Sequence, residues 1–349
     1  MINVGIVGCN FGRAVQLPAF RADPRCEVIA LAGNDAVRTA ELARASNVPR
    51  AYGGWRALVE DDAVQAVAIA TVPILQGQIA VRALELAKPV FAEKPMAASL
   101  DDAQAMLRQA KVSRLPTMID FNFHQIMSFQ HAKAKLDEGA IGTLRHVAVH
   151  WHVENRAIQT RMRNWKTLGD QGGGVLGNFV SHCFHYIEWF CGPIARLSAR
   201  LSGLTGEDDL QTTAAIALEL ETGLLASLSV SCASYLGGGH RIEFYGEEGT
   251  LVLHNPGADY MRGFDVLYAK RPAKALVRVP IHDPVDAQYP DGRIAPVSRL
   301  ATRFLDAIET GVPAQPGFVA GYRVQQLIDV VQRSNRQRMA IAVGPPFQS

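Results

Sequence analysis

The first third of the chain alternates short apolar segments with helical ones, and this pattern restricts the fold more than any other feature of the sequence. Strands are expected at residues 3–7, 27–32, 66–70, 88–96 and 117–121, and helices at 14–21, 37–45, 75–87 and 99–113. Two parallel strands that are neighbours in a sheet need a crossover connection, and here an expected helix lies between each strand and the next. The pattern therefore predicts an α/β fold that begins with a parallel, doubly wound sheet.

After residue 122 the pattern changes to a series of strands. A helix at 128–138 precedes strands expected at 144–154, 195–202, 212–221, 224–233, 240–245, 250–254 and 265–269, and helices at 297–310 and 319–337 end the chain. Short turns that contain glycine join several of these strands, which is typical of an antiparallel meander. We therefore expect two domains, residues 1–121 and residues 122–349, the second an α/β domain with a large, mostly antiparallel open sheet.

Bulk composition excludes several classes of partner. The 349 residues carry a formal net charge of only +2 and contain no basic tract of the kind that binds nucleic acid or a membrane surface. Five scattered cysteines without a Cys-x-x-Cys pair favour a reducing compartment. The first residues already read as a strand, and no apolar run reaches membrane-spanning length. We expect a cytoplasmic protein that acts on a small molecule.

A glycine-containing turn follows the first expected strand. It comprises Gly8, Asn10, Phe11, Gly12 and Arg13 and leads into the first helix. A dinucleotide site needs small residues here, so that backbone N–H groups at the helix N-terminus can approach a pyrophosphate. The turn departs from the usual Gly-x-Gly-x-x-Gly spacing, and taken alone it also fits an ordinary strand-to-helix connection.

The end of the second expected strand bears on the choice of cofactor. NAD sites commonly place an acidic residue there to bind the ribose 2′-hydroxyl, whereas this chain has Gly33 and Asn34. The small residue leaves room for a 2′-phosphate, and Arg13 and Arg38 could supply its counter-charge. NADP is the preferred cofactor and NAD the alternative; both arginines would equally suit solvated helix surfaces.

The apolar segment at 88–96 delivers Glu93 and Lys94 to the end of a strand, where Pro95 stops it. In a parallel sheet, ligands bind in the crevice beyond the carboxyl ends of the strands. Lys94 is therefore aimed at whatever the preceding strand–helix units bind. A surface lysine beside a turn proline is the alternative for an isolated motif of this kind.

A second polar group lies in the C-terminal half. A run of three glycines at 172–174 introduces a helix on which Asn178, His182 and His185 share one face if the helix is continuous. A polar face on an otherwise apolar helix must find hydrogen-bond partners. Those partners are either the ligands of a cleft that Lys94 also faces or a buried hydrogen-bond network.

In this order, the glycine turn, Ala70-Thr71, Glu93-Lys94-Pro95 and the glycine-run helix that bears His182 resemble the glucose-fructose oxidoreductase and inositol dehydrogenase family, also called Gfo/Idh/MocA. The resemblance runs nearly end to end. It implies a Rossmann domain followed by an α/β domain whose open sheet often builds dimers or tetramers. The same resemblance implies an NAD(P)-dependent oxidoreductase.

The resemblance also implies roles for individual residues. Lys94 would contact the substrate oxygen beside the nicotinamide, and His182 would be the acid/base. Thr71, Pro73, Trp165 and Lys166 match segments that line the cofactor in the family. Chemistry makes a similar demand, because a carbinol must lose its hydroxyl proton as hydride leaves, and a cation stabilises the developing alkoxide.

Three departures from the family pattern affect the substrate more than the fold. Asn178 stands where the family usually has an Asp that pairs with the histidine, Phe123-His124 replace an arginine segment, and Val72-Pro73 replace Pro-Asn. His124, His152 and His185 are further candidates for contact with the substrate. His150, His152 and Glu154 share a strand face that could bind metal but would equally suit a subunit interface, so no metal is expected.

The leading hypothesis is an NAD(P)-dependent oxidoreductase acting on a sugar, a cyclic polyol or a related hydroxylated metabolite, with a homodimer or homotetramer built through the C-terminal sheet. A redox-neutral, NAD-dependent glycosidase or eliminase is the second hypothesis. The Asn178 exchange motivates a third, a weakly catalytic NADP-binding sensor or regulatory subunit.

Overall fold

The computed structural model describes residues 1–203, 210–257 and 259–345, which form two compact units. The first unit contains Met1–Asn122 together with Val285–Gln325, and the second contains Phe123–Pro284 and the chain from Gln326 onward. The first unit therefore differs from the expected domain of residues 1–121, because a C-terminal segment returns to complete it.

The first unit contains a six-stranded parallel sheet with the order β3-β2-β1-β4-β5-β6. Its strands are β1 (Ile2–Val7), β2 (Cys26–Ala32), β3 (Arg50–Tyr52), β4 (Ala66–Ile69), β5 (Val90–Ala92) and β6 (Thr117–Ile119). All of its paired strands run parallel, which confirms the doubly wound sheet. The strand order reverses between β1 and β4, and ligands of such sheets bind at this point.

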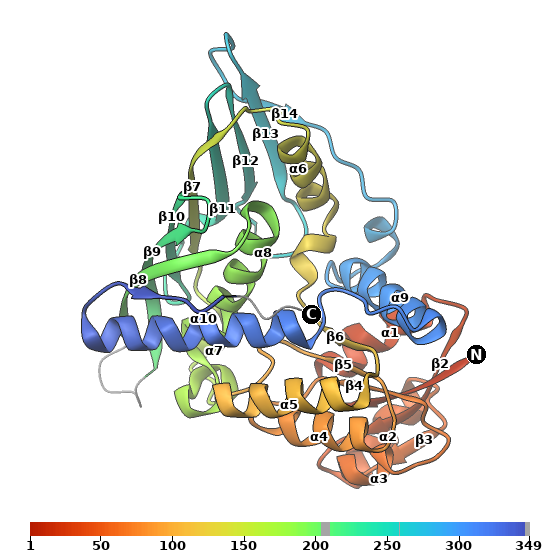
Figure 1. Cartoon of the computed structure of the whole chain (residues 1–349). Helices are drawn as coiled ribbons and strands as arrows, with labels where there is room; N and C mark the ends of the chain where they lie inside the picture. The colour runs from red at the N-terminus through yellow and green to blue at the C-terminus, as the bar shows by residue number, and fades with distance from the viewer. Residues whose placement is uncertain (204–209, 258, 346–349) are drawn as a thin grey trace. The chain divides into compact units, whose positions relative to one another are not determined.

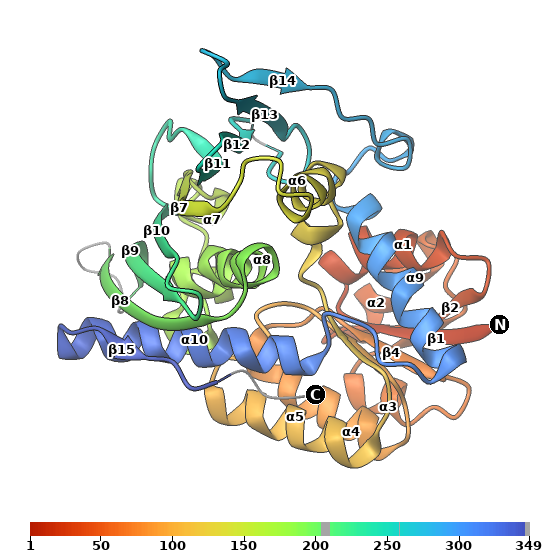
Figure 2. The same ribbon diagram turned by 45° about the horizontal axis from the view of Figure 1, so that its top comes forward.

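Helices cover both faces of this sheet (Figure 1). The helices of this unit are η1 (Gly12–Gln16), α1 (Leu17–Arg21), α2 (Ala36–Ala45), α3 (Trp55–Val59), α4 (Pro73–Glu85), α5 (Leu100–Ser113) and α9 (Ile294–Thr310). The short helix η6 (Asp286–Gln288) and the first turns of α10 (Phe318–Gln337) also belong to it. Helices α4 and α5 pack side by side, and α1 packs against α9, as Figure 2 also shows.

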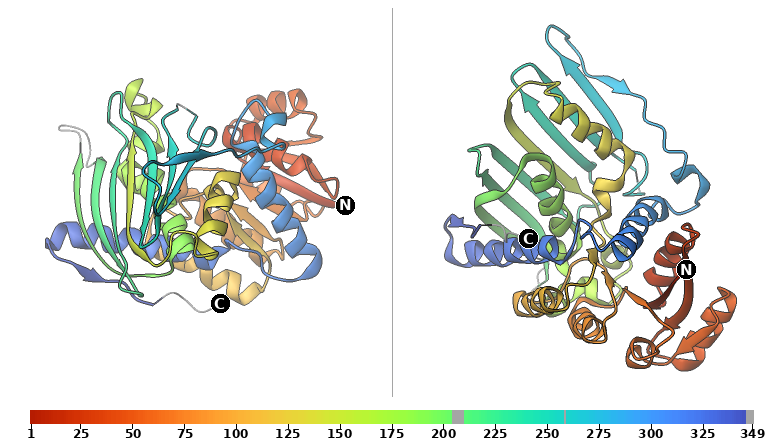
Figure 3. Two further views of the ribbon diagram at one scale, coloured as in Figure 1. Left: turned by 90° about the horizontal axis from the view of Figure 1, so that it is seen from above. Right: turned by 45° about the vertical axis from the view of Figure 1, so that its right-hand side comes forward.

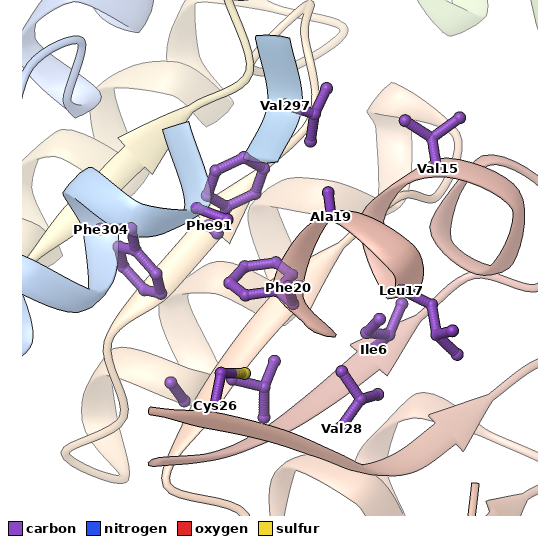
Figure 4. Packing of buried hydrophobic residues seen from close by; sticks show 14 of the residues in the cluster. Ile6, Val15, Leu17, Ala19, Phe20, Cys26, Val28, Phe91, Val297 and Phe304 are labelled. Carbon is purple, nitrogen blue, oxygen red and sulfur yellow. The ribbon is translucent and has the colours of Figure 1, made fainter. Parts of the chain in front are cut away.

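The returning helix α9 belongs to the first unit because its apolar face completes that unit's core. Phe304 of α9 forms edge-to-face contacts with Phe20 of α1 and Phe91 of β5, at centroid distances of 6.3 and 5.8 Å, and Phe20 and Phe91 are 5.3 Å apart. All three rings are fully buried (Figure 4). Each such ring pair adds about 0.5–1.5 kcal/mol to the free energy gained by burying apolar area.

The second unit contains a large sheet, which Figure 3 shows in two views. It has nine strands in the order β14-β13-β12-β11-β7-β10-β9-β8-β15. Its strands are β7 (Leu144–His152), β8 (Ile194–Gly203), β9 (Gln211–Leu220), β10 (Leu225–Ser231), β11 (Gly239–Gly246), β12 (Gly249–Asn255), β13 (Asp265–Lys270), β14 (Val277–Val279) and β15 (Ile341–Ala342). The mostly antiparallel sheet is confirmed. The simple meander is wrong at β7, which lies between β10 and β11 and pairs with β10 in parallel.

Helices α6 (Met127–Asp137) and α8 (Ser181–Cys191) share one face of this sheet and contact each other through Phe129 and Tyr186, whose centroids are 5.7 Å apart. The C-terminal part of α10 is attached to β8, because Ala199 N donates to Ser334 Oγ at 3.0 Å and Leu201 N donates to Asn335 Oδ1 at 3.0 Å. Short helices η2 (Asn122–Gln125), α7 (Arg156–Gln159), η3 (Trp165–Thr167), η4 (Gly169–Gln171) and η5 (Leu176–Val180) complete the described elements. Within the residues described, no helix has the length and apolarity needed to span a membrane.

Candidate active site

The glycine turn after β1 is packed so tightly against β4 that side chains cannot replace its glycines. Gly8 has φ of +128°, and a Cβ added to it would lie 2.3 Å from the carbonyl oxygen of Ala70. A Cβ on Gly12 would lie 2.7 Å from a methyl of Ile6. The turn therefore leaves its backbone exposed to a ligand at the switch point of the sheet.

The helix that follows this turn begins with a π-helical segment, η1 (Gly12–Gln16). Segments of this type occur often at functional sites. Arg13 lies in it, and its Nε atom is buried and has no hydrogen-bond partner among the residues described. The Arg293 guanidinium lies over the ring of Phe11, 5.4 Å from its centroid, and also binds Asp291. Local sequence patterns could not predict this contact, because it joins residues from opposite ends of the sequence.

The end of β2 also requires glycine. A Cβ on Gly33 would lie 2.5 Å from Thr39 Oγ1 and 2.7 Å from Cys9 Sγ. Asp35 caps α2 by accepting a hydrogen bond from the backbone N–H of Arg38 at 3.0 Å, so its carboxylate is engaged with the helix N-terminus. Asn34 and Arg38 are exposed. Position 33 therefore has no side chain, and the basic side chain of Arg38 lies in the first turn of the helix that follows.

Thr71 and Pro73 lie directly beyond the carboxyl end of β4. Pro73 is the first residue of α4 and is buried, and Thr71 is half-buried. Proline suits the first helical position because the N–H that it lacks would have no partner within the helix. These residues occupy the same edge of the sheet as the glycine turn.

Glu93 and Lys94 follow the end of β5 at this edge. The backbone N–H of Glu93 donates to Ile69 O at 2.9 Å, and the side chain of Gln16 donates to Glu93 Oε1 at 3.1 Å. Gln76 donates to the backbone oxygens of Glu93 and Pro95 at 3.0 and 2.8 Å. The segment that carries Lys94 is therefore fixed on both sides by buried amides, which sequence reasoning did not find.

The side-chain carboxyl of Asp120, the residue after β6, is a neighbour of the Glu93 carboxyl. Burial, and next the Asp120 carboxyl, raise the pKa of Glu93 well above its ordinary value, and Lys94 opposes the rise. Burial raises the pKa of Asp120 to about 6. Sequence reasoning missed Asp120, although an aspartate at the end of an apolar strand was a signal for it.

In the second unit, the helix that bears His182 is not a continuous α-helix. Residues Leu176–Val180 form a π-helical segment, after which α8 begins at Ser181. Asn178 lies in the π segment and donates to Gly174 O at 2.8 Å and to Lys166 O at 3.3 Å. The expected single face is therefore replaced by separate surroundings for each polar residue.

His182 is buried within a cluster of aromatic rings. Its ring contacts Phe123 edge to face at 4.7 Å, and Trp151 lies 6.3 Å away. Trp151 stacks on His240 at 4.0 Å with nearly parallel planes, and Nε2 of His240 lies 3.0 Å from the Tyr186 hydroxyl. Burial lowers the pKa of His240 to about 3, so this imidazole is neutral. Strand spacing alone had not associated these rings with His182.

The remaining candidate histidines have different surroundings. The ring centroids of His185 and His124 are 5.2 Å apart. Burial, and to a smaller extent the charge of His124, lowers the pKa of His185 well below its ordinary value. His152 lies 2.8 Å from Ser229 Oγ. Successive side chains of a strand point to opposite faces, so His152 projects away from the face on which Trp151 approaches His182.

Trp165 and Lys166 form the short helix η3, which Asn164 caps. The ammonium of Lys166 lies 5.9 Å from the centre of the Trp165 ring. Because Asn178 binds the Lys166 carbonyl, the structure joins this segment to the helix of His182. Over the described ranges, no group of three or more metal-binding side chains is arranged to hold a metal ion.

Comparison with known proteins assigns both halves of the chain. Residues 2–121 match the profile of the oxidoreductase family with an NAD-binding Rossmann fold, and residues 129–252 match the GFO/IDH/MocA C-terminal domain. The chain belongs to the Gfo/Idh/MocA family. This Gfo/Idh/MocA protein is an oxidoreductase with a nicotinamide dinucleotide-binding domain, and the resemblance, the fold class and the cofactor class predicted from the sequence are confirmed.

Relatives cover nearly the whole of this Gfo/Idh/MocA chain. An uncharacterized oxidoreductase of Synechocystis sp. is 30% identical over 98% of the chain and 96% of its own length. Levoglucosan dehydrogenase of Pseudarthrobacter phenanthrenivorans is 26% identical over 95% of the chain and 96% of its own length.

Solved structures share the fold. Levoglucosan dehydrogenase in complex with NADH and levoglucosan has a TM-score of 0.88 at 21% identity, covering 99% of this chain and 100% of that one. An oxidoreductase domain protein from Kribbella flavida has a TM-score of 0.87 at 24% identity with the same coverage.

Proposed function

We propose that this protein is an NAD(P)-dependent dehydrogenase or reductase that acts on a CH–OH group of a sugar, a cyclic polyol or a related hydroxylated metabolite. One observation carries the proposal: Lys94 follows the carboxyl end of β5 in the NAD-binding domain, on the sheet edge that also holds the glycine turn. The names of the relatives, among them levoglucosan and D-apiose dehydrogenases, support the substrate class.

The bound nicotinamide would accept or donate the hydride at its C4 position. Lys94 would place its ammonium against the substrate oxygen and stabilise the negative charge that develops as the hydroxyl proton leaves. Gln76 and Gln16 would hold the Lys94 segment in place through the contacts described above.

His182 would accept the hydroxyl proton during oxidation and return it during reduction. A neutral imidazole suits this step because one of its ring nitrogens carries a lone pair that can accept a proton. Asn178 cannot serve as an anionic partner for this histidine, and its hydrogen bonds to Gly174 and Lys166 support a positioning role for the Trp165–Lys166 segment.

The test is the loss of turnover in Lys94→Ala and in His182→Ala while NADH binding, measured by fluorescence titration, persists. Lys111→Ala and His282→Ala are matched controls, because both residues are exposed. If both groups act on one substrate, the double variant loses no more activity than the more damaged single variant, since residues that act as a unit are non-additive. Normal turnover in either single variant would overturn the proposal.

The cofactor choice, NADP over NAD, rests on the absence of a side chain at Gly33 and on the exposure of Arg38. Arg13 is the second candidate for the 2′-phosphate, since its buried Nε lacks a partner among the described residues. We also propose, as partners and location, self-association through the open face of the nine-stranded sheet and residence in the cytoplasm.

A further inference from the structure

We propose that Glu93 and Asp120 form a buried carboxyl pair that shares one proton, and that the single negative charge of this pair keeps the Lys94 side chain protonated and in place. Neither residue touches the reacting atoms in this scheme, so both are positioning residues. The inference deepens the proposed function, because it concerns the state of the lysine to which that function assigns the oxyanion.

The pair is a product of strand register. In the sheet, Ala92 of β5 is the partner of Ile119 of β6, and the backbone N–H of Asp120 donates to Ala92 O at 2.8 Å. The residues that follow the two strand ends, Glu93 and Asp120, are therefore neighbours. Asp120 is fully buried and Glu93 is half-buried, so water does little to separate the two carboxyl groups.

The surroundings of Asp120 favour a proton within the pair. Neither carboxyl oxygen of Asp120 receives a hydrogen bond from a donor group among the residues described, and the carboxyl that it meets within hydrogen-bonding reach is that of Glu93. Two carboxylates repel each other at such a distance, whereas a carboxylic acid and a carboxylate form a strong hydrogen bond. The raised pKa of both groups agrees with a proton that stays in the pair at neutral pH.

The charge left on the pair acts on Lys94. Lys94 is adjacent to Glu93 in the chain, and its charge opposes the rise in pKa of both carboxyl groups. By reciprocity, the pair raises the affinity of Lys94 for its proton. The side-chain amide of Gln16 in η1 holds Glu93 Oε1 in this arrangement at 3.1 Å, and Gln76 of α4 fixes the backbone on both sides of Lys94.

Amide substitutions separate the charge from the proton. In Glu93→Gln or Asp120→Asn, the amide can replace the protonated partner, and the remaining carboxylate keeps the negative charge. The double variant Glu93→Gln/Asp120→Asn has no charge. The exposed Asp62→Asn is a matched control, and circular dichroism with NADH titration verifies folding of each full-length variant.

The readout is the pH midpoint at which the Lys94 amine becomes reactive toward trace acetic anhydride, measured by peptide mass spectrometry without substrate. We expect the double variant to lower this midpoint by about one unit or more, as loss of a nearby opposite charge does, and each single variant to lower it by less than half as much. An unchanged midpoint in the double variant, or single variants that match the double, would overturn the proposal.

A second measurement uses the native chain and does not depend on the folding of any variant. Infrared difference spectroscopy at pH 7.5 should show the C=O band of a protonated carboxyl, and its absence would overturn the proposal. Both readouts are independent of turnover. A protein that passes them but oxidises no polyol would therefore disprove the proposed function and leave the carboxyl pair intact.

Discussion

Asp120→Asn should stabilise the protein in a manner that depends on pH. Asp120 is fully buried, and its pKa is raised to about 6 from an ordinary value of 3.8. The folded state therefore holds a proton that the unfolded state has lost between these two pH values, and the free energy of unfolding falls as pH rises through this window. A difference of roughly two units corresponds to about 3 kcal/mol, which the native chain has lost at pH 7. Asparagine does not ionise and avoids this loss.

The assay is urea unfolding of both proteins at pH 4 and at pH 7.5, with hydrogen exchange of peptides from β5 and β6 to locate the effect. The advantage of Asp120→Asn over the native chain should grow by about 3 kcal/mol or more between the two pH values, because Glu93 in the variant also no longer holds a proton that the unfolded chain has released. Asp62→Asn, at an exposed position, should show no such growth. An Asp120→Asn advantage that is the same at both pH values would refute the reasoning, because Asp120 would then ionise at its ordinary pKa.

Three further predictions concern the first unit. Phe304→Ala should lower the free energy of unfolding by about 3–5 kcal/mol through loss of ring contacts and cavity formation, while Val312→Ala, 65% exposed, should change it by less than about 0.5 kcal/mol; a small effect of Phe304→Ala in urea unfolding would contradict the role of α9 in this core. Gly8→Ala should reduce NADH affinity at least tenfold in fluorescence titration, because its Cβ would displace the Ala70 carbonyl; native affinity would exclude a role of this turn in binding. Arg38→Ala should weaken NADPH binding by about tenfold or more, the equivalent of one hydrogen bond to a charged group, and leave NADH binding unchanged; equal effects on both would contradict a 2′-phosphate contact.

Most elements of the first unit followed from local sequence because apolar periodicity determines both the strands and the helices between them. The strand β3 (Arg50–Tyr52) and the helix α3 (Trp55–Val59) were not predicted, because each is too short to show a period. Most of the expected boundaries lie within two residues of those in the structure, as for β2, expected at 27–32 and observed as Cys26–Ala32. The β5 strand is shorter than expected, because the chain turns away at Glu93. Pairing order in the second sheet was not predictable, since β7 and β10 meet across 72 intervening residues.

The positions of Lys94 and Gly8 beyond strand ends were predictable, because each follows an apolar segment directly. Contact partners from distant parts of the sequence were not predictable. Gln16 contacts Glu93 across 77 positions, and the Phe123 ring contacts His182 although α6, β7 and four short helices separate the two residues in the chain. The π segment at Leu176–Val180 also escaped prediction, because one extra residue in a helical turn leaves the apolar pattern almost unchanged.

The return of Val285–Gln325 to the first unit has a consequence for synthesis of the chain on the ribosome. Domains commonly fold in order as they emerge from the ribosome, but here the opening 122 residues must wait for α9 before their aromatic core can close. Until α9 is synthesised, the Phe20 and Phe91 rings cannot pack against Phe304. We therefore expect chaperones to bind this exposed apolar surface of the nascent chain. A recombinant version of the NAD-binding unit should accordingly carry α9 on a linker rather than end at Asn122.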